Sequence, residues 1–500
     1  MIQIEKEQDV ETLRQVALLL HRENQVLRQR IGALQAEIGR LSGVDSSALQ
    51  MELTQLQELL AQREKALFGD SSEKRARQDG QSGDPKETKA PRRGHGPRTQ
   101  PQLPLIDQIH ALPAEQRDCP QCGGQLVEMG QQFEESEEIS VVERRFVVVR
   151  HRRTKYRCAC NGSVVTAPGP RKLMAGGRYS PELAVEVAAS KYLDHLPLER
   201  QVRIMDREGL VIDSQTLWNQ IEALARHLEP SYKALTKKVL AAPLVYADET
   251  HWRLMNSEGT SRWWAWCTAS QEAVAYRIFS SRSQQAARTV LAGYRGIVMA
   301  DGYGAYEALA RAGPSFTMAH CWAHVRRKFI EAEPNYQAAT EVLALIGQLY
   351  AVERTVPRQV DCEPGEVLAL RARLRNERSR DIVAKIQKWA EAQRLLPQSS
   401  LGKAVRYMVG LWPGLTRFLE DARIPLDNNT VERALRGMVV GRKNHYGSRS
   451  QRGTEVAALF YSLFESAKLA GVEPKSYVLR ATYAAIDEPG TATLPDPPTS

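Results

Sequence analysis

Leucine recurs at every seventh residue near the start of the chain. The series is Leu13, Leu20, Leu27, Leu34 and Leu41, and three residues before each leucine stand Val10, Ala17, Asn24, Ile31 and Ile38. Leucine at heptad position d with mostly β-branched residues at position a is typical of a parallel coiled-coil dimer, whose register a single Asn at position a can set. The repeat breaks at 42–47 and then resumes. We predict a leucine-zipper-like coiled coil over 1–69 that forms a homodimer or higher oligomer; an amphipathic helix packed on its own domain is the alternative.

A basic, low-complexity segment follows the leucine-rich region. Residues 71–104 contain eight Lys or Arg, four Asp or Glu, and no Phe, Tyr or Trp. Such a composition cannot bury enough apolar surface to order the chain, so we predict a flexible basic linker over 70–104. Contact with DNA phosphates and simple solvation are both consistent with its charge.

Four of the seven cysteines stand in two tight pairs. Cys119 and Cys122 form a CxxC pair, and Cys158 and Cys160 form a CxC pair. Four thiolates in this arrangement predict a tetrahedral site for one structural Zn²⁺, in a zinc ribbon over 105–170. The odd number of cysteines also favours metal binding in a reducing cytoplasm over a disulfide framework.

The run between the two cysteine pairs mixes β-branched and basic residues. Its basic side chains include Arg150, Arg152, Arg153 and Lys155. A zinc ribbon with a basic β-hairpin is a candidate DNA-binding domain. A purely structural zinc site is the alternative, because charge alone specifies no DNA sequence.

The next segment has the pattern of two helices around a turn at Gly209. Asp213 or Ser214 can cap the second helix, and Gln215 and Asn219 would then lie along one side of it. This resembles a helix-turn-helix, which makes Gln215 and Asn219 candidate DNA contacts. A generic pair of packed helices fits the pattern equally well.

Farther along, short apolar runs carry acidic residues. "PLVYADET" (243–250) predicts a strand that ends at Asp248, and "RGIVMADGYGAY" (295–306) predicts one that ends at Asp301. Two β-rich runs and a helical pattern separate them, so we expect an α/β sheet that brings the two aspartates together; an Asp that merely caps a turn is the alternative. Buried carboxylates repel unless a cation neutralises them, and Mg²⁺ (or Mn²⁺) prefers such oxygen ligands. A pair of these ions can activate an attacking oxygen in phosphodiester chemistry.

The stretch "LDNNTVERALR" (426–436) supplies a third carboxylate. Asn428 or Asn429 can cap a helix whose first turn holds Glu432. A lone Glu near Arg is usually half of a solvated ion pair, but two aspartates elsewhere favour a place in a metal site. The basic residues that follow and suit a DNA phosphate are Arg436, Arg442 and Lys443.

Charge and hydropathy limit the class of partner. The chain has 68 Lys or Arg against 59 Asp or Glu, a formal charge of +9 and a pI near 9.1, which favours a polyanion. It has no run of 18 apolar residues, and its N-terminus is charged where a signal peptide would be apolar. We therefore expect a cytoplasmic protein with no membrane partner.

Seven blocks follow one another along nearly the whole chain. They are "ALFGDSSEKR" (66–75), "KYLDHLPLERQ" (191–201), "YADET" (246–250), "ADGYGAY" (300–306), "CWAHVRRKF" (321–329), "DNNTVERALRGMVVGRKNHYGS" (427–448) and "YSLFESAKLAGVEP" (461–474). In this order they resemble the transposases of the IS66 family of bacterial insertion sequences, a branch of the DDE transposases. The sequence departs from the family pattern after "DET", where His251 and Trp252 replace the common Pro or β-branched residue, and in the tight "CAC" pair.

The resemblance implies an RNase H-like catalytic core in which Asp248, Asp301 and Glu432 are the DDE triad. It also makes Cys321 and His324 resemble the C-x-x-H signature found in several DDE families. For His324, a hydrogen bond that braces the active site is favoured over metal ligation, because two ligands do not make a zinc site.

The expected fold class is multidomain α/β. It comprises an N-terminal coiled coil, a zinc ribbon, a helix-turn-helix-like helical segment, an RNase H-like catalytic core with an all-α insertion, and C-terminal helices. After the zinc ribbon, the expected boundaries are 171–240 for the helix-turn-helix-like segment, 241–334 and 426–450 for the two parts of the core, 335–425 for the insertion, 451–488 for the C-terminal helices and 489–500 for a disordered tail.

The implied function is that of a DNA transposase with two Mg²⁺ (or Mn²⁺) ions per active site and one structural Zn²⁺. Its partners would be double-stranded DNA, as element ends and target, and small accessory proteins from the same element, in a nucleoid-associated bacterial protein. A zinc-dependent DNA-binding regulator, such as a decayed transposase, and a nuclease that cuts without joining are the alternatives. The intact acidic trio argues against decay, because DNA binding alone does not favour three carboxylates facing a polyanion.

Overall fold

The computed structural model describes residues 10–40, 47–68, 121, 146–157, 164–256, 259–312, 316–357 and 363–496. The chain divides into two compact units, Met1–Phe68 with Arg145–Ser500, and Gly69–Arg144. All the helices and strands below belong to the first unit. Within the described ranges, no helix combines the length and apolarity needed to cross a membrane.

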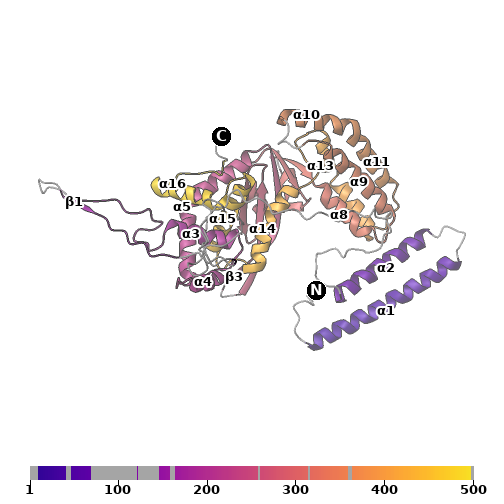
Figure 1. The fold of residues 1–500 in the computed structure, drawn as a ribbon. Coiled ribbons are helices and arrows are strands. Elements are labelled where there is room, and N and C mark those ends of the chain that lie inside the picture. Colours follow the sequence, from indigo (N-terminus) through magenta and orange to yellow (C-terminus); the bar gives the residue numbers. More distant parts are fainter. Residues whose placement is uncertain are drawn as a thin grey trace. The chain divides into compact units, whose positions relative to one another are not determined.

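A mixed sheet of five strands organises the core (Figure 1). The strands are β3 (Leu244–Asn256), β4 (Gly259–Ala269), β5 (Val274–Phe279), β6 (Ile297–Ala300) and β7 (Thr317–His320), in the order β5-β4-β3-β6-β7. The pairs β3–β4 and β4–β5 are antiparallel, whereas β6 pairs in parallel with both β3 and β7. The α/β class expected from the apolar runs is therefore confirmed.

Short helices connect the strands on the parallel side of the sheet. They are α6 (Gln284–Val290) before β6, α7 (Gly304–Arg311) before β7, and α8 (Trp322–Ala332) after it. The Ser283 hydroxyl caps α6 by accepting from the Ala286 N–H group. Each crossover returns the chain to the same end of the sheet, as parallel pairing requires.

Two long helices cover the antiparallel strands. Helix α14 (Asn429–His445) packs on β3 and β4, and α15 (Gln451–Leu469) packs on β5. On α15, the hydroxyls of Ser462 and Ser466 accept hydrogen bonds of 2.9 Å from the Tyr276 and Val274 N–H groups of β5. The exposed N–H groups of this edge strand are thus satisfied by a helix, which also blocks pairing with another chain.

The helices α3 (Pro181–Tyr192), α4 (Leu198–Arg207), α5 (Ser214–Ala241) and α16 (Pro474–Asp487) pack with α15 into the same hydrophobic core. The turn between α4 and α5 contains Gly209 with φ of 85°. Of the two candidate caps, Asp213 is the one used: its carboxylate accepts from the Thr216 N–H at 2.7 Å.

Only helices lie between α8 and α14 in the described part of the chain, where the sequence predicts an all-α insertion over 335–425. They are α9 (Ala338–Arg354), α10 (Pro364–Leu374), the π-helical turn η3 (Arg375–Ser379), α11 (Arg380–Ala392), α12 (Ser400–Gly410), α13 (Trp412–Thr416) and the 3₁₀ turn η4 (Arg417–Leu419). We call this set the 338–419 helices.

The leucine-rich region forms two helices, α1 (Val10–Arg40) and α2 (Ser47–Phe68), separated at the break that the heptad pattern predicts. The two helices pack against each other (Figure 1). An ion pair of 3.3 Å joins Arg30 and Glu52. Leu34 and Leu53 are buried. Part of the leucine stripe is therefore used within one chain, and the zipper between two chains stays a prediction.

Two expectations for irregular regions need correction. Residues 489–496 are not disordered, because the Thr493 N–H donates to Ser231 Oγ at 2.9 Å and Lys238 pairs with Asp496 at 2.8 Å. In the run before the CxC pair, only β1 (Lys155–Arg157) is a strand among the described residues, paired with β2 (Val164–Thr166). The β-rich composition of 146–154 therefore did not produce a longer hairpin.

A buried guanidinium joins the 338–419 helices. The Arg375 side chain is 1% exposed, and its Nε and Nη2 atoms donate to the carboxylate of Glu353 at 2.6 and 3.0 Å. Its Nη1 atom donates to the Phe418 carbonyl oxygen at 2.7 Å. Such a pair adds little net stability, but loss of one partner leaves a buried charge without a counter-charge.

We predict that Glu353→Gln destabilises the 338–419 helices by about 3–5 kcal/mol, because Arg375 keeps its charge in the interior. The double variant Glu353→Gln/Arg375→Met should lose less. Thermal unfolding combined with limited proteolysis measures the effect, with Glu366→Gln, an exposed position on α10, as control. Equal losses in Glu353→Gln and Glu366→Gln would contradict the prediction.

Candidate active site

Asp248 lies within β3 and not at its end. The parallel pairing of β3 with β6 stops at Tyr246 opposite Met299, but β3 continues to Asn256 through its antiparallel pairing with β4. The expected strand end at Asp248 is therefore wrong. The apolar run predicted an end at Asp248 because β3 stops pairing with β6 at Tyr246, although its pairing with β4 continues. Asp248 therefore lies where β3 has a partner strand on one side only.

Asp301 follows the last residue of β6, as expected. Its Oδ1 atom accepts from the Tyr303 N–H at 3.0 Å, so the turn holds the carboxylate in place. The next residue, Gly302, has φ of 89°, and a Cβ atom there would lie 2.6 Å from a methyl carbon of Leu411. Glycine is thus required at this position by both conformation and space.

Glu432 lies in the first turn of α14, and Asn428 fixes the start of that helix. Asn428 is completely buried; its side-chain amide donates to the Ala247 carbonyl oxygen at 3.2 Å, and its N–H donates to Cys321 Sγ at 3.3 Å. Its side chain makes no helix cap, contrary to one of the two expectations. The amide instead ties the helix to the residue before Asp248.

The three acids share one electrostatic environment. Burial, together with the negative charges of Asp301, Glu249 and Glu432, raises the pKa of Asp248 to about 8. Burial disfavours the charged form, and each neighbouring carboxylate disfavours it further. The fold therefore brings together the three carboxylates that the sequence predicts, at a free-energy cost to the chain without a cation.

This arrangement fits a divalent cation. The donors are carboxylate oxygens, which Mg²⁺ and Mn²⁺ prefer. The Oε1 atom of Glu432 is buried, and no group in the described ranges donates a hydrogen bond to it. A buried carboxylate oxygen without a donor, next to an aspartate held partly protonated, is the environment that a bound cation would relieve.

Cys321 and His324 lie beside Glu432. The ligand atoms of these three residues are within 4.8 Å of one another, and His324 Nε2 is 3.6 Å from Glu432 Oε1. Burial raises the pKa of the Cys321 thiol to about 12, and its sulfur accepts the Asn428 N–H. At 3.6 Å the imidazole and the carboxylate are too far apart for a hydrogen bond.

Glu249, next to Asp248, points to the other face of β3, as its position in the strand predicts. Its side chain is 1% exposed, its Oε1 accepts from Arg282 Nε at 2.9 Å, and its Oε2 accepts from the Tyr306 hydroxyl at 2.9 Å. Burial raises the pKa of Glu249, and Arg282 opposes that shift. Sequence reasoning missed Arg282, because 33 residues separate it from its partner.

Basic residues of α14 divide into two groups. Arg433, Arg436 and Lys443 are exposed at spacings of three and seven along the helix, and we call them the α14 stripe. Arg442 instead turns back to β3, where its Nη1 atom donates to Thr250 Oγ1 at 3.1 Å and to the His251 carbonyl oxygen. The structure therefore keeps Arg436 and Lys443 on one surface and uses Arg442 to hold the strand.

Other predicted contact residues lie at the surface away from these acids. Arg150, Arg152, Arg153 and Lys155 are exposed, and Arg153 Nε donates to the Ala167 carbonyl oxygen at 2.6 Å. On α5, Gln215 and Asn219 are exposed and hydrogen-bonded to each other at 2.9 Å. The expected zinc ligands Cys119, Cys122, Cys158 and Cys160 lie outside the described residues, as do the whole expected linker, 70–104, and the side chain of Asn24.

Comparison with protein families assigns both regions. Residues 176–456 match the model of the transposase IS66 family, and this match contains Asp248, Asp301 and Glu432. Residues 116–161 match the zinc-finger binding domain of transposase IS66, and this match contains all four cysteines of the expected zinc site.

Relatives in one bacterium share almost the entire chain. The uncharacterized protein y4jD of Sinorhizobium fredii is 31% identical, with 94% of this chain and 92% of the relative covered. The uncharacterized protein y4qI of the same organism is 30% identical, with 94% and 93% covered. A third, y4hP, is 28% identical over 75% of this chain and 71% of its own length.

The raised pKa of Asp248 predicts a stability that depends on pH. Its folded-state pKa of about 8 exceeds the ordinary value of about 3.9, so its contribution is complete below the ordinary value and is lost as pH rises toward 8. The slope of the free energy of unfolding against pH from this one group is at most about 1.4 kcal/mol per pH unit.

Without divalent ions, we predict that Asp248→Asn has a higher melting temperature than the unaltered protein at pH 8, and that this difference shrinks toward pH 5. Asp381→Asn, an exposed aspartate on α11, is the control; a difference that does not change with pH would refute the prediction.

Proposed function

The chain belongs to the IS66 family of transposases, and we propose that it binds the terminal inverted repeats of its insertion sequence and catalyses metal-dependent cleavage and transfer of DNA strands. The observation that carries this proposal is that three half-buried carboxylates, one in β3, one directly after β6 and one in the first turn of α14, lie near enough for Asp301 and Glu432 to act on Asp248. We assign Asp248, Asp301 and Glu432 as the catalytic triad of an RNase H-like core. The five-stranded mixed sheet, with acids where β3 and β6 stop pairing, supports that assignment.

The triad would hold two Mg²⁺ or Mn²⁺ ions, and the negative charges of both Asp301 and Glu432 act on Asp248. When bound, such ions lower the pKa of an attacking water or hydroxyl and neutralise charge on the phosphate. The chain itself contributes rigid placement, because β3, β6 and α14 all belong to the packed core. His324 would act as a positioning residue that keeps the Glu432 carboxylate turned toward the site.

DNA would be held by basic surfaces on three elements. The α14 stripe begins one residue after Glu432, so a phosphate bound there lies close to the triad. Gln215 and Asn219 on α5, and Arg150, Arg152, Arg153 and Lys155 near β1, would bind more distant parts of the element end. The zinc-finger domain holds one structural Zn²⁺ through its four cysteines in this proposal.

We propose that two or more copies act together through the leucine stripe of α1 and α2, because transposition must join two element ends. Leu27, Ile31 and Ile38 of the heptad series are only half-buried, which leaves apolar surface for a second chain. Small accessory proteins from the same element and a nucleoid location remain parts of the proposal.

The decisive experiment supplies DNA ends from the flanks of this protein's own gene together with Mg²⁺. We expect cleaved and joined products from the unaltered chain, and a loss of roughly 10²-fold or more in Asp301→Asn with DNA binding retained, because the variant loses a metal ligand but no DNA contact. Asp381→Asn on α11 is the matched control.

Cleavage that survives Asp301→Asn would overturn the assigned triad. Binding without cleavage in the unaltered chain would favour a DNA-binding regulator, and cleavage without joining would favour a nuclease. The experiment therefore distinguishes a transposase from the regulator and the nuclease that the sequence also allows.

For the α14 stripe, we predict that Arg436→Gln/Lys443→Gln weakens binding of all DNA sequences alike. Each phosphate contact contributes about 0.9 to the slope of log affinity against log salt, so the slope should fall by up to about 2. Fluorescence anisotropy over a salt series measures it. The double variant Arg354→Gln/Arg394→Gln removes the same charge from exposed positions of the 338–419 helices, and an equal effect there would argue against a local contact.

A further inference from the structure

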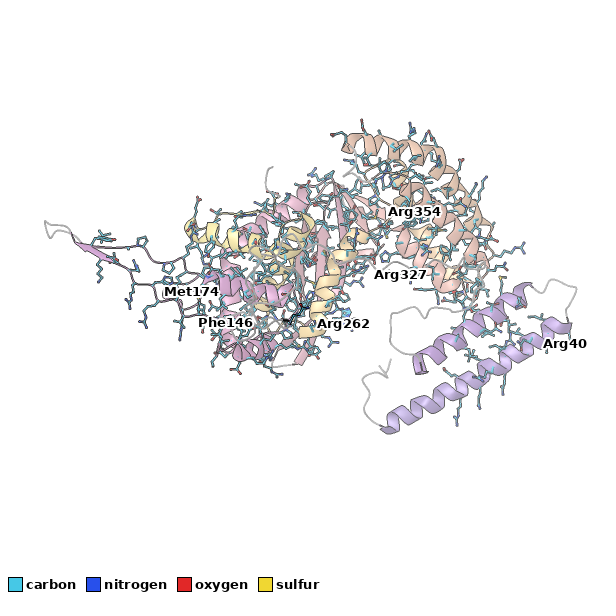
Figure 2. The ribbon with its side chains drawn as sticks, viewed as in Figure 1. Arg40, Phe146, Met174, Arg262, Arg327 and Arg354 are labelled. Atoms are coloured by element: carbon cyan, nitrogen blue, oxygen red, sulfur yellow. The ribbon has the colours of Figure 1, made fainter. Side chains whose placement is uncertain are left out.

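The hairpin of β3 and β4 extends beyond the site and presents two different faces. On one face, Trp252 is completely buried, and its indole N–H donates to Ser448 Oγ at 3.1 Å. The other face carries His251 and Arg253 on β3, paired with Trp264 and Arg262 on β4. His251, Arg253 and Arg262 are exposed and Trp264 is half-buried, so we call these four residues the open face (Arg262 is labelled in Figure 2).

The open face concentrates positive charge. Arg253 lies directly opposite Arg262 across the two strands, an arrangement that is unfavourable for like charges. Burial and the charges of Arg442, Arg262, Arg253 and Arg282 lower the pKa of His251, as expected in a cationic environment. Within the described ranges, neither Arg253 nor Arg262 forms an ion pair with a carboxylate. A bound polyanion would remove this repulsion.

Aromatic contacts connect the open face with the triad. Arg282 lies over the Trp264 ring at 4.8 Å and over the Tyr303 ring at 3.8 Å. Tyr303 in turn donates its N–H to Asp301. His251 meets Trp264 edge to face, with 5.9 Å between ring centroids. Arg282 thus links the hairpin to the turn after Asp301, on the face of β3 that also carries Glu249.

We propose that the open face binds single-stranded DNA that extends past the active site onto the hairpin, with Arg253 and Arg262 on phosphates and a nucleobase stacked against His251 and Trp264. This inference rests on the proposed function and names the part of the substrate that the hairpin holds. Duplex DNA offers phosphates but keeps its bases stacked, so exposed aromatic rings among arginines favour an unpaired strand. The half-buried Trp264 is rigid, which lowers the entropy cost of stacking.

The test measures DNA binding by the full chain carrying Asp301→Asn, so that DNA stays uncut. Three probes are made from one end of the protein's own gene: a duplex that stops at the element boundary, the same duplex with a single-stranded extension of about five nucleotides, and that extension without bases. We expect the extension to tighten binding, and removal of its bases to weaken binding by at least about fivefold, the lower limit for one stacked base.

In Trp264→Leu, the extensions with and without bases should bind equally. Because Trp264 also packs against the core, His251→Ala at an exposed position provides a second test with the same expected direction. Arg253→Gln/Arg262→Gln should remove most of the gain from either extension, whereas Arg354→Gln/Arg394→Gln should leave it unchanged.

The inference is overturned if the extension adds no affinity, or if its gain is the same in the hairpin variants and in the control. Tight binding of the blunt duplex in either case would leave the proposed function intact. Failure of the chain to bind any of the three probes would overturn both.

Discussion

Repulsion among buried carboxylates is the constraint that the rest of this structure serves. Burial and the negative charges of Asp301 and Glu432 both disfavour the charged form of Asp248, so the three acids would move apart if their backbones could move. They stay together because strand pairing fixes the first two, and because Asn428 ties the start of α14 to the Ala247 carbonyl oxygen. Packing and hydrogen bonds of the whole core therefore maintain a site that is unfavourable by itself, as expected where a cation is to bind.

Acidic and basic side chains around the three acids point in different directions, which keeps their charges apart. Adjacent residues of β3 have opposite roles: Asp248 faces the metal-binding side, whereas Glu249 neutralises Arg282 on the other side. Arg442 holds the edge of β3, and the exposed cations of the α14 stripe lie beyond it. In the proposed function, a negative centre with a positive rim would attract a DNA backbone to the edge of the site, and bound cations would offset the repulsion between phosphate and carboxylates.

Local patterns predicted the elements better than their extents. Apolar runs ending in acid revealed the strands, and "DNNTVER" revealed the start of α14, because these signals lie within one turn or one strand. The length of β3 and the ordering of residues 489–496 depend on partners far along the chain, which are β4 in the first case and Ser231 in the second. The pairing of Arg282 with Glu249 and the inward turn of Arg442 were hidden for the same reason, since each joins distant segments.

Because β3 continues past Asp248, its last residues form a hairpin with β4 that has one buried and one exposed face. One face of the added residues is closed by Trp252 and Ser448, so the hairpin is anchored to the core and not a mobile arm. The other face keeps Arg253 and Arg262 exposed and directly opposite each other, although like charges in this position destabilise a strand pair. A hairpin that is anchored on one face and carries repelling cations on the other is typical of a binding site, because a bound anion would offset the free energy of that repulsion.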